Sequence, residues 1–142
     1  ITKILAVKYL AYGNPIQVLG DFFQLTYIHN PGVLFGINFG TRFLYIALSA
    51  FAIVFLFFVY FSEEHYLPRL AIAMIIAGAI GNLIDRIRLG AVIDFLDFDF
   101  PDFIMDRWPI FNFADVAIFL GIVLFFAFFI FHSRKEAPLV KS

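Results

Sequence analysis

Long runs of apolar residues dominate the chain, and short polar segments separate them. The run over 43–61 contains no charged side chain, and further runs cover about 70–84 and 111–131. About 20 apolar residues in a helix cross the roughly 30 Å hydrocarbon core of a bilayer. Each run therefore predicts a membrane helix. Residues 1–13 predict the rest of a first span whose start is missing, which makes four transmembrane helices.

Two segments between the spans carry the pattern of strands. In "DFFQLTYIHNPG" apolar Phe23, Leu25 and Tyr27 alternate with polar residues before an Asn-Pro-Gly turn, which is typical of a half-buried strand. Alternation returns in "LDFDF", and a strand that reached back to Asp94 would place it on the face of Leu96 and away from Asp97. We predict a small extracytoplasmic β-sheet and an interfacial loop on one side of an otherwise all-α membrane protein.

Small residues recur at every fourth position in the third run. Ala73, Ala77 and Gly81 would lie on one face of the helix over 70–84. Small side chains let two membrane helices approach closely. The stripe therefore predicts a helix contact on this face.

Composition supports a membrane protein of one domain, residues 1–142. Hydrophobic residues make up 63% of the 142 positions and charged residues 15%, and the net charge is -1. Such a chain has too little polar surface to coat a soluble globule, and it has no basic field for nucleic acid. It contains no cysteine, which excludes disulfides, a thiolate nucleophile and cysteine-based metal sites. No cofactor or metal is expected.

The acidic residues divide by their surroundings. We expect Asp97 and Asp99 and the nearby Asp102 and Asp106 to lie on a solvated loop, with Asp21 in a similar setting. Three acids remain: Asp85, Asp94 and Asp115. All three are predicted at the same membrane face.

Two of these three acids have a structural reading beside a functional one, whereas Asp94 has no adjacent base and is flanked by Ile93 and Phe95. Asp85 precedes Arg86, and the two could form an ion pair that closes a helix end. Asp115 could serve as a carboxylate favoured by the helix dipole. However, an acid kept inside an apolar span is costly, so it is a functional hypothesis by default.

Two carboxylates close together in a poorly solvated site share one proton, and such a pair can act as general base and general acid on a water molecule. The four serines lie in no G-x-S-x-G motif, and the three histidines have no zinc spacing. An aspartate pair is the catalytic set that remains. From the residues alone, a membrane aspartyl hydrolase and a small proton- or ion-coupled transporter are both open, and a purely structural membrane protein is a third reading.

Four stretches in a fixed order resemble the motifs of the bacterial signal peptidase II family, the lipoprotein signal peptidases. They are "TYIHNPGVLFGI", "AGAIGNLIDRIRLGAVIDF", "FPDF" and "IFNFADVAIFLGIVL", joined by Thr2-Lys3 near the start. The resemblance implies an integral membrane aspartyl endopeptidase that cleaves prolipoproteins just before a cysteine carrying diacylglycerol. An inactive homologue would share these motifs.

Mapped by motif, the resemblance implies that Asp94 and Asp115 are the catalytic pair. Residues that bind substrate or stabilise the site would be Lys3, Asn30, Gly32, Asn82, Asp85, Arg86 and Asn112. Ala77 stands where many members have a second glycine, and Leu34 stands where a smaller residue is usual.

The resemblance also implies orientation and partners. Lys and Arg are spread evenly over the two sides of the expected spans, so the positive-inside rule does not orient the chain. The family implies a bacterial inner membrane, cytoplasmic termini and a site at the periplasmic or outer face. The expected partners are a diacylglyceryl prolipoprotein and membrane lipid, with no nucleic acid and a monomeric enzyme.

Overall fold

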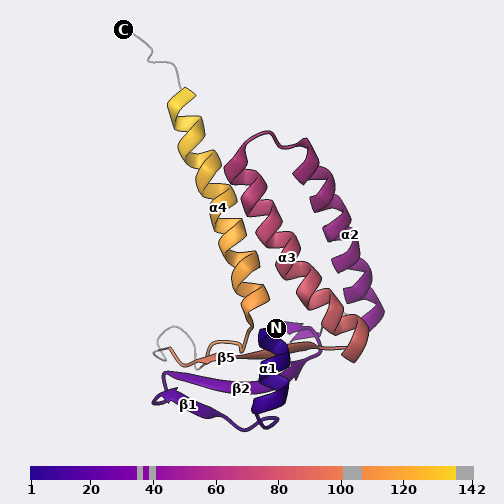
Figure 1. Ribbon diagram of the computed structural model, residues 1–142, viewed down its shortest axis with the longest axis vertical. Coiled ribbons are helices and arrows are strands. Elements are labelled where there is room, and N and C mark those ends of the chain that lie inside the picture. The colour runs from indigo at the N-terminus through magenta and orange to yellow at the C-terminus, as the bar shows by residue number, and fades with distance from the viewer. Residues whose placement is uncertain (35–36, 39–40, 101–106, 137–142) are drawn as a thin grey trace.

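Four helices and a small antiparallel sheet make up the computed structural model of this chain, which describes residues 1–34, 37–38, 41–100 and 107–136 (Figure 1). In chain order the elements are α1 (Thr2–Tyr9), β1 (Ile16–Leu19), β2 (Phe23–Asn30), β3 (Val33–Leu34), β4 (Ile37–Asn38), α2 (Arg42–Ser62), α3 (Tyr66–Leu89), β5 (Val92–Phe98) and α4 (Phe113–Glu136).

Three of the described helices are long and apolar enough to cross a membrane: α2, α3 and the part of α4 over Phe113–Phe131. They confirm the three long apolar runs as helices. Bulky side chains on α2 and α4, such as Phe51, Phe58 and Phe126, are exposed, as lipid contact requires. The fourth expected span is not confirmed, because α1 has eight residues.

Helices α3 and α4 approach each other closely at glycines. A side chain at Gly78 would collide with the Ala114 carbonyl oxygen, and one at Gly121 would lie 2.7 Å from the Ala71 carbonyl oxygen. The expected stripe of small residues is therefore wrong at its centre, because Ala77 is exposed and Gly78 faces the partner. Two helices packed this closely cannot easily slide past each other. The contact therefore fixes the position of the start of α4 relative to α3.

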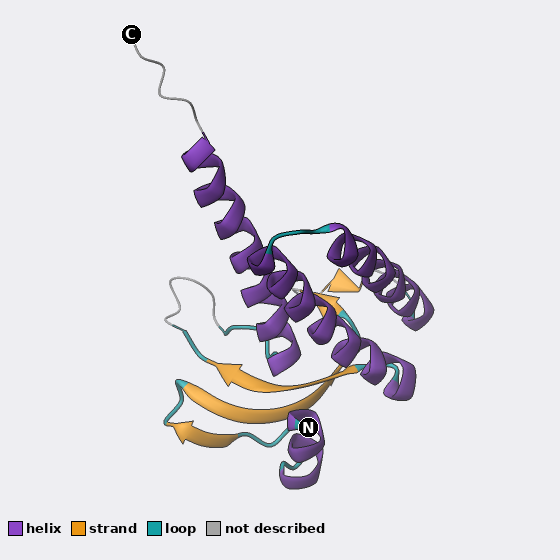
Figure 2. Cartoon of the chain, turned by 45° about the horizontal axis from the view of Figure 1, so that its top comes forward, coloured by secondary structure: helices purple, strands orange, loops and turns teal. Residues whose placement is uncertain are grey.

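The sheet confirms both predicted strand segments. Its order is β1-β2-β5, and both pairings are antiparallel; Figure 2 shows the three strands with α1 beside them. The register shifts between Leu25 and Ile28, so that Gln24 lies opposite Asp97 and Ile28 lies opposite Asp94. The strand predicted from "LDFDF", which is β5, does reach back to Asp94. Successive residues of a strand point to opposite faces.

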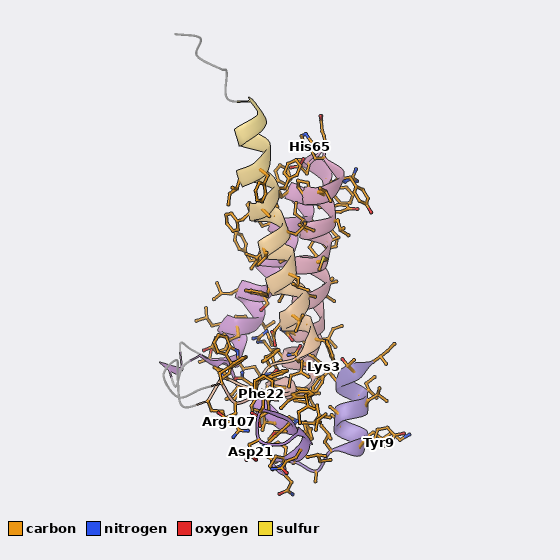
Figure 3. The ribbon with its side chains drawn as sticks, turned by 90° about the vertical axis from the view of Figure 1, so that its left-hand side faces the viewer. Lys3, Tyr9, Asp21, Phe22, His65 and Arg107 are labelled. Atoms are coloured by element: carbon orange, nitrogen blue, oxygen red, sulfur yellow. The ribbon has the colours of Figure 1, made fainter. Side chains whose placement is uncertain are left out.

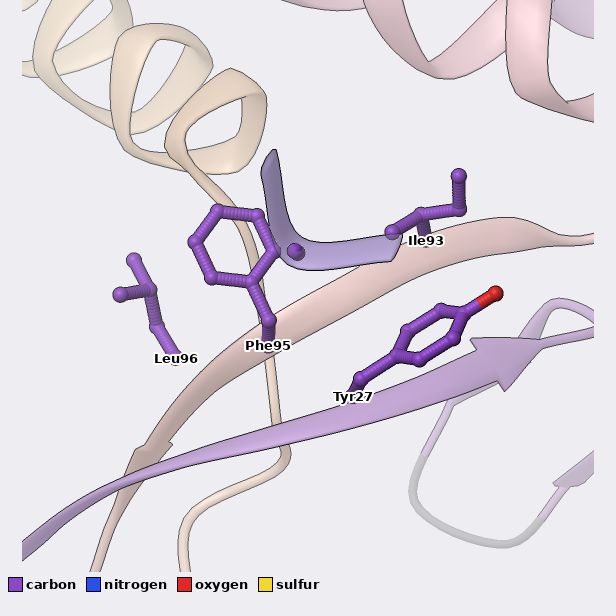
Figure 4. Close-up of a cluster of buried hydrophobic side chains, with 5 residues drawn as sticks. Tyr27, Ile93, Phe95 and Leu96 are labelled. Carbon is purple, nitrogen blue, oxygen red and sulfur yellow. The ribbon is translucent and has the colours of Figure 1, made fainter. Parts of the chain in front are cut away.

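An apolar cluster joins α1 to the sheet. Ala6 of α1 packs with Tyr27 of β2 and with Ile93, Phe95 and Leu96 of β5 (Figure 4). A separate cluster, built on Ile53, Ile72 and Ile76, joins α2 to α3. The two clusters show that the sheet and the helices are stabilised by different parts of the core.

The sheet lies across one end of the three long helices (Figure 1). Lys3, Asp21 and Arg107 lie at this end, and His65, in the α2–α3 turn, lies at the other (Figure 3). Because α3 ends and α4 begins beside β5, polar groups from all three elements can meet there.

Candidate active site

Asp115 is part of the cap that starts α4. Asn112 precedes the helix, and its side-chain oxygen accepts hydrogen bonds from the backbone N–H groups of Ala114 (2.7 Å) and Asp115 (3.4 Å). The Asp115 Oδ2 accepts a return bond of 3.0 Å from the Asn112 backbone N–H. This reciprocal arrangement is a capping box, with Asp in the place of the usual Glu. It confirms that Asp115 lies in the first turn and fixes where its carboxylate points.

Asp94 lies in β5 and is 2% exposed. Its two carboxylate oxygens accept hydrogen bonds from neutral amides: Asn112 Nδ2 at 2.6 Å and Asn30 Nδ2 at 3.0 Å. Burial raises the pKa of the Asp94 carboxyl from 3.8 to about 6, and the negative charge of Asp115 adds to the rise, whereas the two amides oppose it. Asp94 can therefore exchange a proton at a pH where an ordinary aspartate is ionised.

Two asparagines connect the acids. Asn82 of α3 donates from Nδ2 to Asp115 Oδ1 at 2.7 Å, and its Oδ1 accepts from Asn112 Nδ2 at 3.2 Å. Asn112 thus contacts Asp94, Asn82 and Asp115 and is fully buried. Neutral amides hold the two carboxylates side by side without neutralising either charge.

A lysine and a third acid support this pair. Lys3 of α1 donates to Asn82 Oδ1 and to Asp85 Oδ2, both at 2.6 Å. The Asp85 carboxylate also accepts from the Ile93 backbone N–H at 3.1 Å, which ties the end of α3 to β5. Asp85 is 5% exposed. A carboxylate this buried is stable only with a charged partner, and Lys3 is that partner.

The expected pairing of Asp85 with Arg86 is wrong. Adjacent residues of a helix point in different directions and do not face each other. The Arg86 guanidinium instead lies 6.0 Å from the centre of the Tyr45 ring on α2. Lys3 and Asp85 lie far apart in the sequence, so the sequence did not indicate that Lys3 is the partner of Asp85.

Asp97 is also placed differently from the prediction of a solvated loop. It lies in β5 and is 2% exposed. Its carboxylate accepts from Arg107 Nε at 2.8 Å and from the Thr26 hydroxyl, and Arg107 also donates to Gln24. The polar face of β2 is therefore buried under this network instead of facing water. Asp99 is partly exposed near Arg107, Asp21 is exposed, and Asp102 and Asp106 lie outside the described residues.

An apolar cavity of about 450 Å³ adjoins the acid pair. Asp115 lines it together with the apolar residues Phe100, Trp108, Phe111, Val116 and Phe119. Such a cavity receives an apolar ligand and presents it to one carboxylate. The acid pair therefore borders an apolar binding space.

The structure brings together eight of the nine expected site residues in one hydrogen-bond network, of which six lie around the acid pair: Lys3, Asn30, Asn82, Asp94, Asn112 and Asp115. Asp85 joins through Lys3, and Gly32 donates its backbone N–H to Asn30 Oδ1 at 2.9 Å. Arg86 is the expected residue that lies outside this network, over the ring of Tyr45. Sequence reasoning missed the capping box, although its signal, Asn-x-x-Asp before an apolar run, is visible in "NFAD".

Chemically, the network suits hydrolysis by general acid and base. It supplies one buried acid with a raised pKa, a second carboxylate nearby and a border with an apolar cavity. Among the described residues no group of three or more His, Asp or Glu side chains could hold a metal ion. The two carboxylates are the groups of this network that could transfer protons.

Comparison with known proteins identifies the relatives of this chain. A family model described as signal peptidase (SPase) II matches residues 1–131. A protein named lipoprotein signal peptidase from Borreliella afzelii is 35% identical over 95% of this chain and 84% of its own length. One of the same name from Halothermothrix orenii is 38% identical over 87% of this chain and 81% of its own length.

A solved structure shares the fold. It is described as a bacterial membrane enzyme determined by the in meso method at 2.3 Å resolution. It superposes with a TM-score of 0.80 at 28% identity and covers 99% of this chain and 85% of the other. The similarity therefore extends over the helices and the sheet together.

Proposed function

The chain belongs to the signal peptidase II family, whose members are proteases that remove signal peptides from lipoproteins, and on that basis we propose that Asp94 and Asp115 are its catalytic dyad. The substrate is a prolipoprotein with a diacylglyceryl cysteine, and cleavage falls just before that cysteine. The observation that carries the proposal is the contact of both acids with Asn112, in a network of neutral amides.

Asp94 is assigned as the member of the dyad that carries the shared proton. Its raised pKa, about 6, supports this role, because two carboxylates held together in a poorly solvated site do not both ionise. Asp115 is assigned as the ionised base. Its carboxylate accepts hydrogen bonds from Asn82 and from the Asn112 backbone N–H, which orient it.

The reaction follows from these two protonation states. Asp115 removes a proton from a water molecule, and the resulting hydroxide attacks the carbonyl carbon of the peptide bond while Asp94 donates its proton to the carbonyl oxygen. When the tetrahedral intermediate collapses, the proton on Asp115 passes to the leaving nitrogen and the hydroxyl proton returns to Asp94. The C–N bond breaks, and the dyad regains its initial protonation state.

The apolar cavity beside Asp115 receives the acyl chains or the apolar part of the signal peptide. Anchoring the substrate in lipid fixes the depth of the peptide bond, which converts binding into positioning. Apolar walls also exclude bulk water, which strengthens the electrostatic interactions of the dyad.

The proposed location is a bacterial inner membrane, with the termini in the cytoplasm and the dyad at the periplasmic or outer face. Asp94 lies in β5 and Asp115 in the first turn of α4, and the position of β5 across one end of the long helices (Figure 1) supports an interfacial site. Four spans remain part of this proposal, with α1 contributing to the first. The enzyme is proposed to act as a monomer, and its other partner is membrane lipid.

A cleavage assay tests the proposal. The full chain in detergent is incubated with a diacylglyceryl-modified prolipoprotein, and mass spectrometry identifies the products. We expect a mature fragment that begins with the diacylglyceryl cysteine and a released signal peptide, with an unchanged rate in the presence of a chelator. A folded parent chain that produces no cleavage, or cleavage at another bond, would contradict the proposed function.

A further inference from the structure

We propose that Tyr45 of α2 is a positioning residue, which holds the side chain of Asn30 in the orientation that donates a hydrogen bond to Asp94. Its importance for catalysis depends on the proposed function, in which Asp94 carries the shared proton. Tyr45 lies in the first turn of α2, the one long helix that contributes no residue to the acid network described above.

Three hydrogen bonds connect Tyr45 to the acid. The Tyr45 hydroxyl donates to the Gly32 carbonyl oxygen at 2.9 Å, and the Gly32 backbone N–H donates to Asn30 Oδ1 at 2.9 Å. Asn30 Nδ2 then donates to Asp94 Oδ2 at 3.0 Å. Because the Asn30 oxygen is engaged by Gly32, the amide nitrogen is the atom turned to Asp94. A rotated amide would place its oxygen against the carboxylate.

The ring of Tyr45 packs directly on Gly32. The backbone of Gly32 has φ +101°, and a Cβ there would lie 2.8 Å from the ring. Only glycine combines this conformation with this contact at low cost. The ring therefore restricts the turn after β2 from one side while the hydroxyl holds it by the carbonyl group.

Contacts between α2 and the neighbouring helix α3 restrict the position of Tyr45. The Arg86 guanidinium of α3 lies 6.0 Å from the ring centre, which is within the range of a cation–π contact. Arg42 donates to the backbone carbonyl oxygens of Arg86 at 3.2 Å and Ile87 at 2.7 Å, which ties the start of α2 to the end of α3. Arg86 thus acts on the site through Tyr45 instead of through Asp85.

A Tyr at the end of a membrane helix has a simpler reading as an interfacial aromatic residue. The two readings differ in what the hydroxyl does. An interfacial anchor depends on the ring, whereas a positioning residue depends on the bond to Gly32. Tyr45→Phe separates them, because it keeps the ring on Gly32 and removes the hydroxyl.

The first test compares two identical substitutions on one helix. We expect Tyr45→Phe to lower kcat by about tenfold, the size of effect that follows if loss of the bond to Gly32 lets Asn30 release its hydrogen bond to Asp94, with KM changed less than about twofold. Tyr60→Phe, near the other end of α2, is the matched control and should leave both constants unchanged. An unchanged kcat in Tyr45→Phe overturns the proposal.

A double-mutant cycle tests the route through Asn30. In an Asn30→Ala background the hydroxyl has no amide to position, so Tyr45→Phe should cause almost no further loss of kcat. Effects that multiply, with parallel losses of thermal stability, would show that Tyr45 only supports the fold, and the proposal would fail.

A third readout does not need turnover. The Asp94 carboxyl can be titrated by ¹³C NMR in the parent, Tyr45→Phe and Tyr60→Phe chains. Asp94 is faced by the charges of Asp115 from α4 and Lys3 from α1 and by the amides of Asn30 and Asn112. Loss of the Asn30 donor should raise the pKa of Asp94 in Tyr45→Phe alone. If the parent cleaves no prolipoprotein, the proposed function fails and this titration still decides the role of Tyr45; equal titration curves overturn it.

Discussion

Asp94 and Asp97 lie three residues apart on β5, and both are 2% exposed, yet they have different partners. Asp97 accepts hydrogen bonds from the Arg107 guanidinium and the Thr26 hydroxyl. Asp94 accepts them from the neutral amides of Asn30 and Asn112. One strand therefore carries a buried acid with a positive partner and a buried acid that, in the part of the chain that the structure describes, has none in direct contact.

The difference shows what makes a buried carboxylate useful for chemistry. A guanidinium compensates the charge of Asp97, which then serves to hold Arg107 and β2 against β5. Amides orient Asp94 but leave its charge uncompensated, so burial dominates and its pKa rises to about 6. Burial alone does not distinguish the two acids; the neutral donors and the second carboxylate beside Asp94 are what support its proposed catalytic role.

The largest expected effect is on the rate of cleavage, and it separates Asp94 from Asp97. Asp94→Asn and Asp115→Asn should each lower the rate by at least about 10³-fold, because each removes a group that transfers a proton. Asp97→Asn should retain the parent rate within about threefold per folded molecule. Initial rates on one prolipoprotein preparation, with circular dichroism to confirm folding, measure all three. A comparable loss in Asp97→Asn would remove the distinction.

The second prediction concerns stability against pH. The folded pKa of Asp94 is raised above 3.8, so the folded chain binds more protons than the unfolded chain between about pH 4 and 6, and the parent loses stability as the pH rises through this range. A rise from 3.8 to about 6 corresponds to about 3 kcal/mol at most.

Asp94→Asn lacks this titration and provides the comparison. Its stability relative to the parent should increase by up to about 3 kcal/mol between pH 4 and pH 7. Denaturant unfolding in detergent at several pH values gives the difference. Parallel stability curves for the two chains would show that Asp94 ionises in the folded chain as it does in the unfolded chain.

The third prediction concerns the ion pair. Asp97→Asn should lower the free energy of unfolding by about 2 kcal/mol, because it removes the buried charged partner of Arg107. The effect is moderated because the Arg107 side chain is 42% exposed and because Asp99 remains 3.9 Å from the guanidinium. A cycle with Arg107→Gln should give a coupling of about 1 kcal/mol. Additive effects would show that the pair contributes no stability of its own.

The smallest expected effect concerns the cap of α4. Asn112→Ala should cost about 1 kcal/mol of stability through loss of the cap, and Asn112→Ser should recover most of it. Neither variant retains the amide N–H groups that reach Asp94 and Asn82, so cleavage should be slow in both. Thermal unfolding and initial rates separate the two roles. Full activity in Asn112→Ser would show that Asn112 acts only as a cap.

The apolar runs predicted the three long helices, because a membrane span has a strong signal in every residue. Alternation in 23–27 and 96–100 predicted a strand in each segment for a similar reason, although β5 begins earlier, at Val92, and ends at Phe98. The stripe of Ala73, Ala77 and Gly81 predicted a close helix contact without naming the partner helix. Gly81 does lie near Ala114 of α4, but the central contact is made by Gly78 and not by Ala77, because such a stripe gives a face only to within one position. The bulge between Leu25 and Ile28 left no visible pattern.

For the candidate site, the sequence predicted which residues the structure brings together better than it predicted the contacts between them. Motifs gave Asp94, Asp115 and the supporting asparagines, but not the bond from Lys3 to Asp85 across most of the chain. Asp97 was expected in water because it begins a series of acids that was assigned to a loop; Arg107 and Thr26, which bury it, come from elsewhere. Tyr45 was hidden in an apolar run, where a hydroxyl has no distinctive sequence signal.

The central claim is that Asp94 and Asp115 form one electrostatically coupled pair, and carboxyl titration by ¹³C NMR tests it most directly. In the parent chain, Asp94 should titrate near pH 6. In Asp115→Asn its pKa should fall, because the neighbouring negative charge is gone, but remain above 3.8, because burial is the larger cause. Titration of Asp94 near 3.8 in the parent, or identical curves in the two chains, would contradict the account.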